Sequence, residues 1–159
     1  MASLGTDETI SRAVRQYSPM LLRLAATRLP SAADAEDAVQ EVFLKLLDAR
    51  PMFRDAEHEK AWLIRATLHR AADIRRKQAR EAPLDTAMEM ESREGESEPQ
   101  LLTAVRTLPE KYASVIHLYY YEGYSIKEIA KLLGLNAATA GTRLARGRER
   151  LRQMLKEDG

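Results

Sequence analysis

The sequence predicts an all-α protein made of two small helical domains that are joined by a flexible acidic linker. Among its 159 residues there are only 7 glycines and 6 prolines, and the runs of helix-forming residues are long. Clusters of β-branched residues, which would favour strands, are rare. Apolar residues make up 45% and charged residues 31%, a balance typical of folded domains rather than of disordered chains.

The net charge of +1 conceals an uneven distribution. Residues 1–80 hold 14 basic and 11 acidic side chains, and residues 100–159 hold 10 and 6. Residues 81–99 hold one arginine and seven acids, together with two prolines and one glycine, and they have no apolar stripe of useful length. We therefore predict one domain at residues 1–80, a linker at 81–99 and a second domain at 100–159.

The first domain is expected to contain three or four helices. Residues 8–28 form the first, because Ile10, Val14, Tyr17, Leu21 and Leu24 or Ala25 recur at helical spacing. After a break at Leu-Pro-Ser, Ser31 can cap a second helix over residues 32–48. A third helix should span residues 57–77 and place Trp62 in the core. The residues expected on the buried side of the second helix are Ala35, Val39, Val42, Phe43, Leu46 and Leu47.

The second domain is expected to be a four-helix domain that contains a helix-turn-helix. Two short helices, at residues 100–108 and 109–123, should come first. Ser125 and Glu128 have the spacing of a capping box that opens a short amphipathic helix. Gly134 then supplies a turn, and Asn136 is a good N-cap for the last helix. A short helix, a glycine turn and a second helix, in this order, form a helix-turn-helix.

The last helix divides into a buried stripe and a polar side. Its buried stripe is Ala140, Leu144, Gly147, Leu151 and Leu155, where Gly147 should permit close helix packing. In a helix-turn-helix the first residues of the second helix enter the major groove, and basic side chains contact phosphates. The candidate DNA-binding residues are Asn136, Thr139, Gly141, Thr142, Arg143, Arg146 and Arg150. Because Gly141 leaves the tip of the helix bare, base readout should depend on the threonines, the arginines and DNA shape.

Three stretches of the chain resemble one known family in the order in which that family has them. "LPEKYASVIHLYYYEGYSIKEIAKLLGLNAATAGTRLARGRERLRQML" resembles the C-terminal promoter-binding domain of bacterial sigma factors of the extracytoplasmic-function (ECF) group. "DAEDAVQEVFLKL" (residues 34–46) resembles the polymerase-binding helix of that family, and "AWLIRATLHRAADIRRK" (residues 61–77) resembles its promoter-melting helix. The resemblance covers nearly the whole chain.

The resemblance implies roles for two faces of the first domain. The residues it implies for binding a coiled coil of the largest polymerase subunit are Asp37, Gln40, Glu41 and Lys45. The residues it implies for the minus-10 promoter element are Arg65, His69, Asp73, Arg76 and Arg80, which also fall on one side of a helix. The last helix would then read the minus-35 element. Two departures concern the minus-10 site, since the family commonly has asparagine in place of His69 and a larger aliphatic residue in place of Ala66.

The expected partners are core RNA polymerase, promoter DNA and, by the resemblance, an anti-sigma protein. The absence of cysteine fits a cytoplasmic protein, and neither a secretory signal nor a membrane-spanning stretch is visible. His58, His69 and His117 have no metal-ligand spacing, so we expect no metal, no cofactor and no enzymatic activity. A stand-alone helix-turn-helix regulator and a degenerate sigma-like protein with weak promoter readout remain as alternatives.

Overall fold

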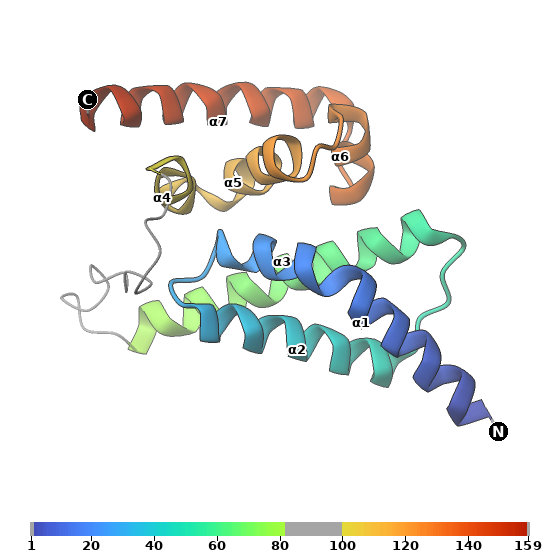
Figure 1. The fold of residues 1–159 in the computed structure, drawn as a ribbon. Helices are drawn as coiled ribbons and strands as arrows, with labels where there is room; N and C mark the ends of the chain where they lie inside the picture. The colour runs from blue at the N-terminus through green and yellow to red at the C-terminus, as the bar shows by residue number, and fades with distance from the viewer. Residues whose placement is uncertain (1, 82–99, 159) are drawn as a thin grey trace.

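The helices lie in two layers (Figure 1). The computed structural model describes the backbone of residues 2–81 and 100–158 and the side chains of residues 8–81 and 104–156, and all of its regular elements are helical. The first layer consists of α1 (Ala2–Ala26), α2 (Ala32–Ala49) and α3 (Ala56–Glu81). The second layer consists of α4 (Gln100–Thr107), α5 (Glu110–Ile116), a π-helical turn η2 (His117–Tyr121), α6 (Ile126–Leu133) and α7 (Ala137–Asp158).

The predicted linker lies outside the described residues, with one exception. Glu81, which we assigned to the linker, is the last residue of α3, because the helix continues four residues beyond the predicted end at Lys77. The helical spacing of Asp73, Arg76 and Arg80 persists through this extension.

The first layer forms its core from one stripe of each helix. Ser31 caps α2 by accepting a hydrogen bond from the Asp34 backbone N–H at 3.1 Å, as predicted. The fully buried side chains of the layer include Leu21, Leu24, Leu29, Val42, Leu63 and Ile64. Two predicted core positions are wrong, because the side chains of Val14 and Leu47 are each 36% exposed. Both line a groove between α1 and α2 that no helix of the described chain fills.

The helix-turn-helix of the second layer forms as the local signals predict. Ser125 Oγ accepts from the Glu128 N–H at 3.1 Å, while Glu128 Oε1 accepts from the Ser125 N–H at 2.9 Å. Gly134 ends α6 with a left-handed backbone, φ +70°, which favours glycine. Asn136 Oδ1 accepts from the Thr139 N–H at 2.8 Å and thereby caps α7. The π-helical turn η2 was not predicted, since we expected one regular helix there.

The two glycines of α7 lie in different surroundings. A Cβ atom on Gly147 would stand 3.0 Å from Cγ1 of Ile116, so the predicted role of this glycine in close helix packing is confirmed. A Cβ atom on Gly141 would meet nothing within 4 Å. The helix therefore needs one glycine for packing and has the other at an open position.

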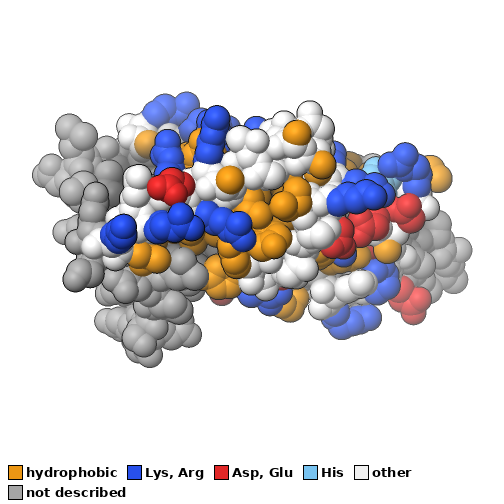
Figure 2. All heavy atoms as spheres, turned by 90° about the horizontal axis from the view of Figure 1, so that it is seen from above, with side chains coloured by type: hydrophobic (Ala, Val, Ile, Leu, Met, Phe, Trp, Pro, Cys, Tyr) orange, Lys and Arg blue, Asp and Glu red, His pale blue; other side chains and the backbone are white. Residues whose placement is uncertain are grey.

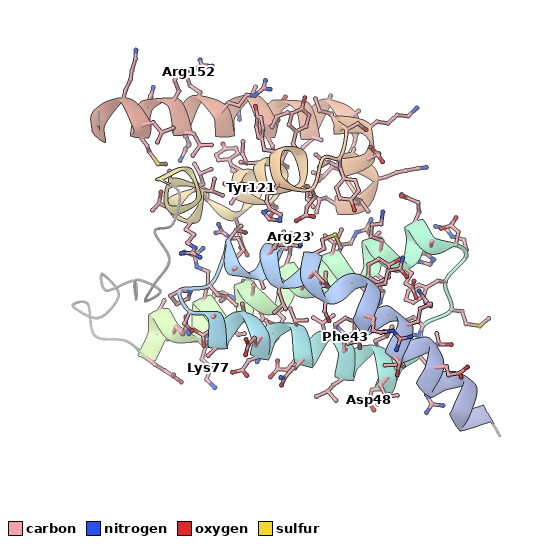
Figure 3. All side chains as sticks on the ribbon, in the orientation of Figure 1. Arg23, Phe43, Asp48, Lys77, Tyr121 and Arg152 are labelled. Atoms are coloured by element: carbon pink, nitrogen blue, oxygen red, sulfur yellow. The ribbon has the colours of Figure 1, made fainter. Side chains whose placement is uncertain are left out.

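A network of charged and polar groups joins the layers. Arg23 of α1 donates two hydrogen bonds to the Glu122 carboxylate, at 3.0 and 2.8 Å, and His117 Nε2 donates a third at 2.8 Å. Figure 3 shows Arg23 and Tyr121 on facing sides of this contact. Farther along the contact, Arg28 donates to the Leu108 carbonyl at 3.3 Å. These bonds link residues that lie up to 99 positions apart in the sequence.

The Glu122 carboxylate should make the stability of the protein dependent on acidic pH. Its burial raises the pKa, but the hydrogen bonds from His117 and Arg23 outweigh burial and lower the pKa from 4.5 to about 2. A folded-state pKa below the unfolded value stabilises the fold above pH 4.5, and this contribution disappears as the pH falls toward 2. Because Arg23 is half exposed, we expect a contribution of about 1–3 kcal/mol at neutral pH.

The measurement is urea unfolding of the wild type and of Glu122→Gln at a series of pH values. The difference in free energy of unfolding should be largest near pH 7 and should shrink between pH 4.5 and about 2. A difference that does not vary with pH would show that the ionised carboxylate is not the source of the stability.

Candidate nucleic-acid and polymerase interface

The predicted minus-35 residues belong to α7 and the turn before it, but only some of them point outward from the outer face of the helix. Thr142, Arg146 and Arg150 are exposed on this face. Figure 2, which views the molecule from the side of the second layer, shows basic side chains spread around a patch of hydrophobic ones. The Asn136 side chain is already engaged in capping the helix. Arg143 is half-buried and lines a cleft between the layers, so it does not point to the outside with the others.

Aromatic rings from α5 and η2 support two of the arginines. The Arg150 guanidinium lies 5.0 Å from the centre of the Tyr112 ring. Arg148 lies 5.7 and 5.5 Å from the rings of Tyr119 and Tyr120 and donates a hydrogen bond to the Tyr120 hydroxyl. Such contacts restrict long side chains and hold their charge toward solvent. Arg148 was not among the residues we predicted, although its place between Arg146 and Arg150 in the basic run was a signal.

The predicted minus-10 residues of α3 face the second layer. Arg65, His69, Asp73 and Arg76 line a cleft of about 470 Å³, and Lys111 and Arg143 line the same cleft from the other side. Asp73 forms an ion pair with Arg76 three residues on, which removes part of the positive charge. Arg80 is exposed near the end of α3 and lies outside the cleft lining. The structure thus brings together residues that we assigned to two different promoter elements.

Next to this cleft lies a pocket of about 380 Å³ at the start of α3. The loop before α3 contributes Arg54 and Asp55, α3 contributes Trp62 and His69, and α6 contributes its C-terminal end. Trp62 is half-buried and contacts the Phe53 ring edge-on at 6.0 Å between ring centres. The prediction that Trp62 belongs to the core is therefore only partly right, since the side chain packs on the core and also lines the pocket.

Arg65 is the residue through which α3 holds the end of α6. Its Nε donates to the Leu132 carbonyl at 2.8 Å, and its Nη2 donates to the Lys131 carbonyl at 2.9 Å. The guanidinium also lies against Gly134, because a Cβ atom there would be only 3.3 Å from Nη2. The last carbonyl groups of a helix lack partners within the helix and carry partial negative charge. Arg65 satisfies two of them.

The predicted polymerase-binding residues lie on the exposed face of α2. Asp37, Gln40, Glu41 and Lys45 are all exposed, and Glu41 forms an ion pair with Arg70 of α3. Leu44, one helical turn after Gln40, is 63% exposed and was not among the residues we predicted. It borders the groove between α1 and α2, which has a volume of about 490 Å³ and a mostly apolar lining. The lining includes Ile10, Val14, Leu22, Val39, Phe43, Leu44 and Leu47.

Within residues 2–81 and 100–158, no group of three or more histidines, aspartates or glutamates is placed to hold a metal ion. Among the helices of this part of the chain, none combines the length and the apolar character needed to cross a bilayer.

Comparison with known proteins assigns the two layers to known regions. The sigma-70 region 2 family model matches residues 13–81, and the sigma-70 region 4 family model matches residues 99–151. The RNA polymerase sigma factor SigV of Bacillus subtilis is 33% identical, over 96% of this chain and 95% of its own length. The ECF RNA polymerase sigma factor SigM of Mycobacterium tuberculosis is 30% identical, over 95% of this chain and 79% of its own length.

Solved structures share the fold. The sigma factor RpoE of Bartonella quintana, crystallised with the anti-sigma factor NepR, superposes with a TM-score of 0.73 at 24% identity and covers 96% of this chain. CnrH, in complex with the cytosolic domain of CnrY, gives a TM-score of 0.66 at 22% identity. Together with the matches to both regions and to relatives along almost their full length, these findings show that the chain belongs to the ECF group of the sigma-70 family of RNA polymerase sigma factors.

Proposed function

We propose that this sigma factor divides promoter recognition among three surfaces, each formed from residues described above. The face of α2 binds core RNA polymerase, the face of α3 with the adjacent pocket binds the minus-10 element, and the outer face of α7 binds the minus-35 element. Sigma factors are initiation factors and not catalysts, so the chain directs transcription without chemistry of its own. The corresponding units are residues 1–81, which end with α3, the acidic linker 82–99 and residues 100–159.

The polymerase-binding proposal rests on the α2 face. Its polar residues are Asp37, Gln40, Glu41 and Lys45, and the exposed Leu44 gives this face an apolar centre. Protein interfaces commonly combine an apolar centre with a polar rim, and a single well-placed apolar side chain can account for much of the affinity. A stand-alone DNA-binding regulator would not need this face, which disfavours that alternative.

The minus-10 proposal rests on the pocket at the start of α3. Melting a promoter requires unstacking bases, which costs a few kcal/mol per base, and a site that holds an extruded base offsets part of this cost. The pocket of about 380 Å³ has Trp62 and His58 rings in its wall and Arg54 and Arg65 at its edge. This combination of aromatic surface and positive charge suits a base with its phosphate. His69, in place of the usual asparagine, lies in the same wall.

The minus-35 proposal rests on α7, with Thr142, Arg146 and Arg150 exposed along one side of a correctly capped helix-turn-helix. Arg148, held by Tyr119 and Tyr120, adds a further cation for the DNA backbone.

We further propose that the chain acts in the cytoplasm, where polymerase and promoters are. An anti-sigma protein is a proposed partner, since the structure of RpoE holds the anti-sigma factor NepR and that of CnrH holds the cytosolic domain of CnrY.

The single experiment that tests the function is transcription with purified components. The chain and core RNA polymerase are incubated with a library of promoter fragments, and open complexes and run-off transcripts are measured. We expect binding to core polymerase and transcripts from a subset of fragments with a shared motif. Failure to bind core polymerase would contradict the proposal, whereas binding without transcripts would favour a degenerate sigma-like protein with weak readout.

Gly141→Lys should change promoter preference. Position 141 has open space around it, so a lysine fits without disturbing the fold. Placed near the tip of α7, it can contact a phosphate or donate to a guanine, and one such base contact changes discrimination by about 1–3 kcal/mol. The measurement is selection of minus-35 sequences by the variant holoenzyme. Gln153→Lys, which adds the same charge at an exposed position three turns later, serves as the control. If both variants select the wild-type motif, the tip of α7 does not lie at the bases.

A further inference from the structure

Three basic side chains gather around one tyrosine ring between α5 and α7. The Nζ atom of Lys111 lies 5.1 Å from the centre of the Tyr112 ring, and the Arg150 guanidinium lies 5.0 Å from the same centre. Arg146 donates a hydrogen bond to the Tyr112 hydroxyl. The three basic side chains are exposed, whereas Tyr112 is only 5% exposed. One buried tyrosine therefore holds three positive charges at the protein surface.

Gly147 allows the tyrosine to lie this close to α7. A Cβ atom on Gly147 would stand 3.4 Å from the Cβ atom of Tyr112, so a larger residue would press against the tyrosine. Arg146 directly precedes this glycine, and Arg150 follows Arg146 by about one helical turn. Both arginines consequently lie on one side of α7, within reach of the ring that packs at Gly147.

The cluster has an excess of positive charge. Arg146 and Arg150 are four residues apart, a spacing at which like charges destabilise a helix. Glu149, the acid that lies between them in the sequence, pairs with a different arginine, and among the described residues no carboxylate forms an ion pair with the three cations. Burial of the Tyr112 hydroxyl raises its pKa, but Lys111, Arg146 and Arg150 outweigh burial and bring the pKa below its ordinary value. The site therefore favours an anion.

We propose that Tyr112 is a positioning residue that gathers Lys111, Arg146 and Arg150 into one binding site for a backbone phosphate of the minus-35 DNA. The proposal rests on the proposed function, in which α7 binds the minus-35 element. Arginine and lysine form strong hydrogen bonds with phosphate oxygens, and such contacts fix how a protein lies on the duplex. Lys111 extends the DNA-binding surface from α7 to α5. Tyr112 itself does not contact the DNA.

Preorganisation is the physical reason for a tyrosine at this position. Long basic side chains lose rotamer freedom when an interface immobilises them, and this loss lowers the affinity. A cation above an aromatic ring is attracted by the quadrupole of the ring, and a hydroxyl that accepts from a guanidinium fixes its orientation. The two contributions can be removed separately, because Tyr112→Phe keeps the ring and Tyr112→Leu removes both the ring and the hydroxyl.

Tyr17 supplies a matched control. It is 4% exposed, against 5% for Tyr112, and it belongs to α1 in the first layer. Its hydroxyl also has a charged hydrogen-bond partner, Glu59. Tyr17→Phe and Tyr112→Phe thus remove the same group from equally buried side chains, and only Tyr112 belongs to the cationic cluster.

The experiment measures the affinity of variant holoenzymes for a promoter fragment that yields run-off transcripts with the wild type, over a range of salt concentrations. We expect Tyr112→Leu to weaken binding about five- to tenfold, Tyr112→Phe about two- to threefold, and Tyr17→Phe not at all. Lys111→Gln and Arg150→Gln should each weaken binding about three- to tenfold. Replacing both together should reduce the slope of log affinity against log salt by about 0.9, the value for one phosphate contact.

A double-mutant cycle distinguishes positioning from a general loss of structure. In a chain that already carries Arg146→Gln and Arg150→Gln, Tyr112→Leu should change promoter affinity by less than about twofold, because little is left to position. An undiminished effect in that chain would show that Tyr112 acts through the fold alone and would overturn the proposal. Circular dichroism checks that each variant is folded. If Tyr112→Leu does not fold, Tyr112→Phe is compared in the same two chains.

The results also separate the phosphate site from the proposed function. Unchanged affinity and salt dependence in both Lys111→Gln and Arg150→Gln would overturn the site, while transcripts from the wild-type holoenzyme would leave the proposed function standing. Inorganic phosphate is the second probe. If it raises the melting temperature of the free wild-type chain but not of Arg150→Gln, and promoter binding is the same for both, the cluster binds free anions and the assignment to DNA is wrong. If no promoter fragment yields transcripts, the proposed function fails and this assignment fails with it.

Discussion

Gly147→Leu is expected to destabilise the helix-turn-helix layer by at least about 3 kcal/mol, toward the upper end of what overpacking costs in a core. A Cβ atom alone would lie 3.0 Å from Cγ1 and 3.2 Å from Cδ1 of Ile116, and Tyr112 Cβ is 3.4 Å away. Ile116 is 1% exposed and cannot move aside into solvent. The further atoms of leucine would have to separate α7 from α5, and so disturb the packing that holds α7 in place.

The measurement is chemical unfolding followed by circular dichroism, with Gly141→Ala as the control. Nothing lies within 4 Å of a Cβ atom on Gly141, so this substitution should gain about 1 kcal/mol from helix propensity alone. The two glycines of α7 are therefore expected to respond in opposite directions. Equal stability of Gly147→Leu and the wild type would show that α5 and α7 are not packed as described.

Leu44→Glu is expected to weaken binding to core RNA polymerase by at least about tenfold, without loss of stability. Loss of an apolar residue from the centre of an interface commonly costs 1–2 kcal/mol or more, and a charge in its place adds a desolvation cost. Because Leu44 is 63% exposed in the free chain, the fold itself should hardly respond. The measurement is the dissociation constant for core polymerase, determined with labelled sigma factor.

The control for Leu44 is Met52→Glu, which makes a similar change at a side chain that is 93% exposed and outside the α2 face. It should leave the affinity for core polymerase unchanged. Glu41 is a less suitable position for charge reversal, because its carboxylate pairs with Arg70 of α3, and a lysine there would also disturb the packing of α2 on α3. Core binding that is equal in Leu44→Glu and Met52→Glu would remove Leu44 from the proposed interface.

The features that the sequence predicted correctly depend on neighbours within a few positions. The capping box of Ser125 and Glu128, the left-handed Gly134 and the Asn136 cap each involve residues at most three apart, and each formed as expected. Helical spacing also located the buried stripe of α7, apart from Leu155, which is only half-buried. Such signals are readable because a helix fixes which residues share a face.

The features that the sequence could not predict depend on which helix faces pack together across distant parts of the chain. Leu47 has helical spacing for burial, but it lies at the edge of a groove that α1 leaves open. The sequence indicates that Arg65 belongs to a solvent-facing basic stripe. Its carbonyl partners lie in α6, up to 67 positions later in the chain, so they become apparent only when the two helices are placed side by side. The side chains of Arg23 and Glu122, 99 positions apart, carried no local sign of pairing.

Gly134 links the turn of the helix-turn-helix to the first layer in a way that bears on sequence variation. Its backbone, at φ +70°, suits glycine, and the space where a side chain would stand is bounded by the guanidinium of Arg65. A single substitution at position 134 therefore has two effects: it alters the angle at which α7 leaves the turn, and it displaces the guanidinium of Arg65. Positions 65 and 134 should accordingly vary together among sequences that keep this arrangement, although one belongs to region 2 and the other to region 4.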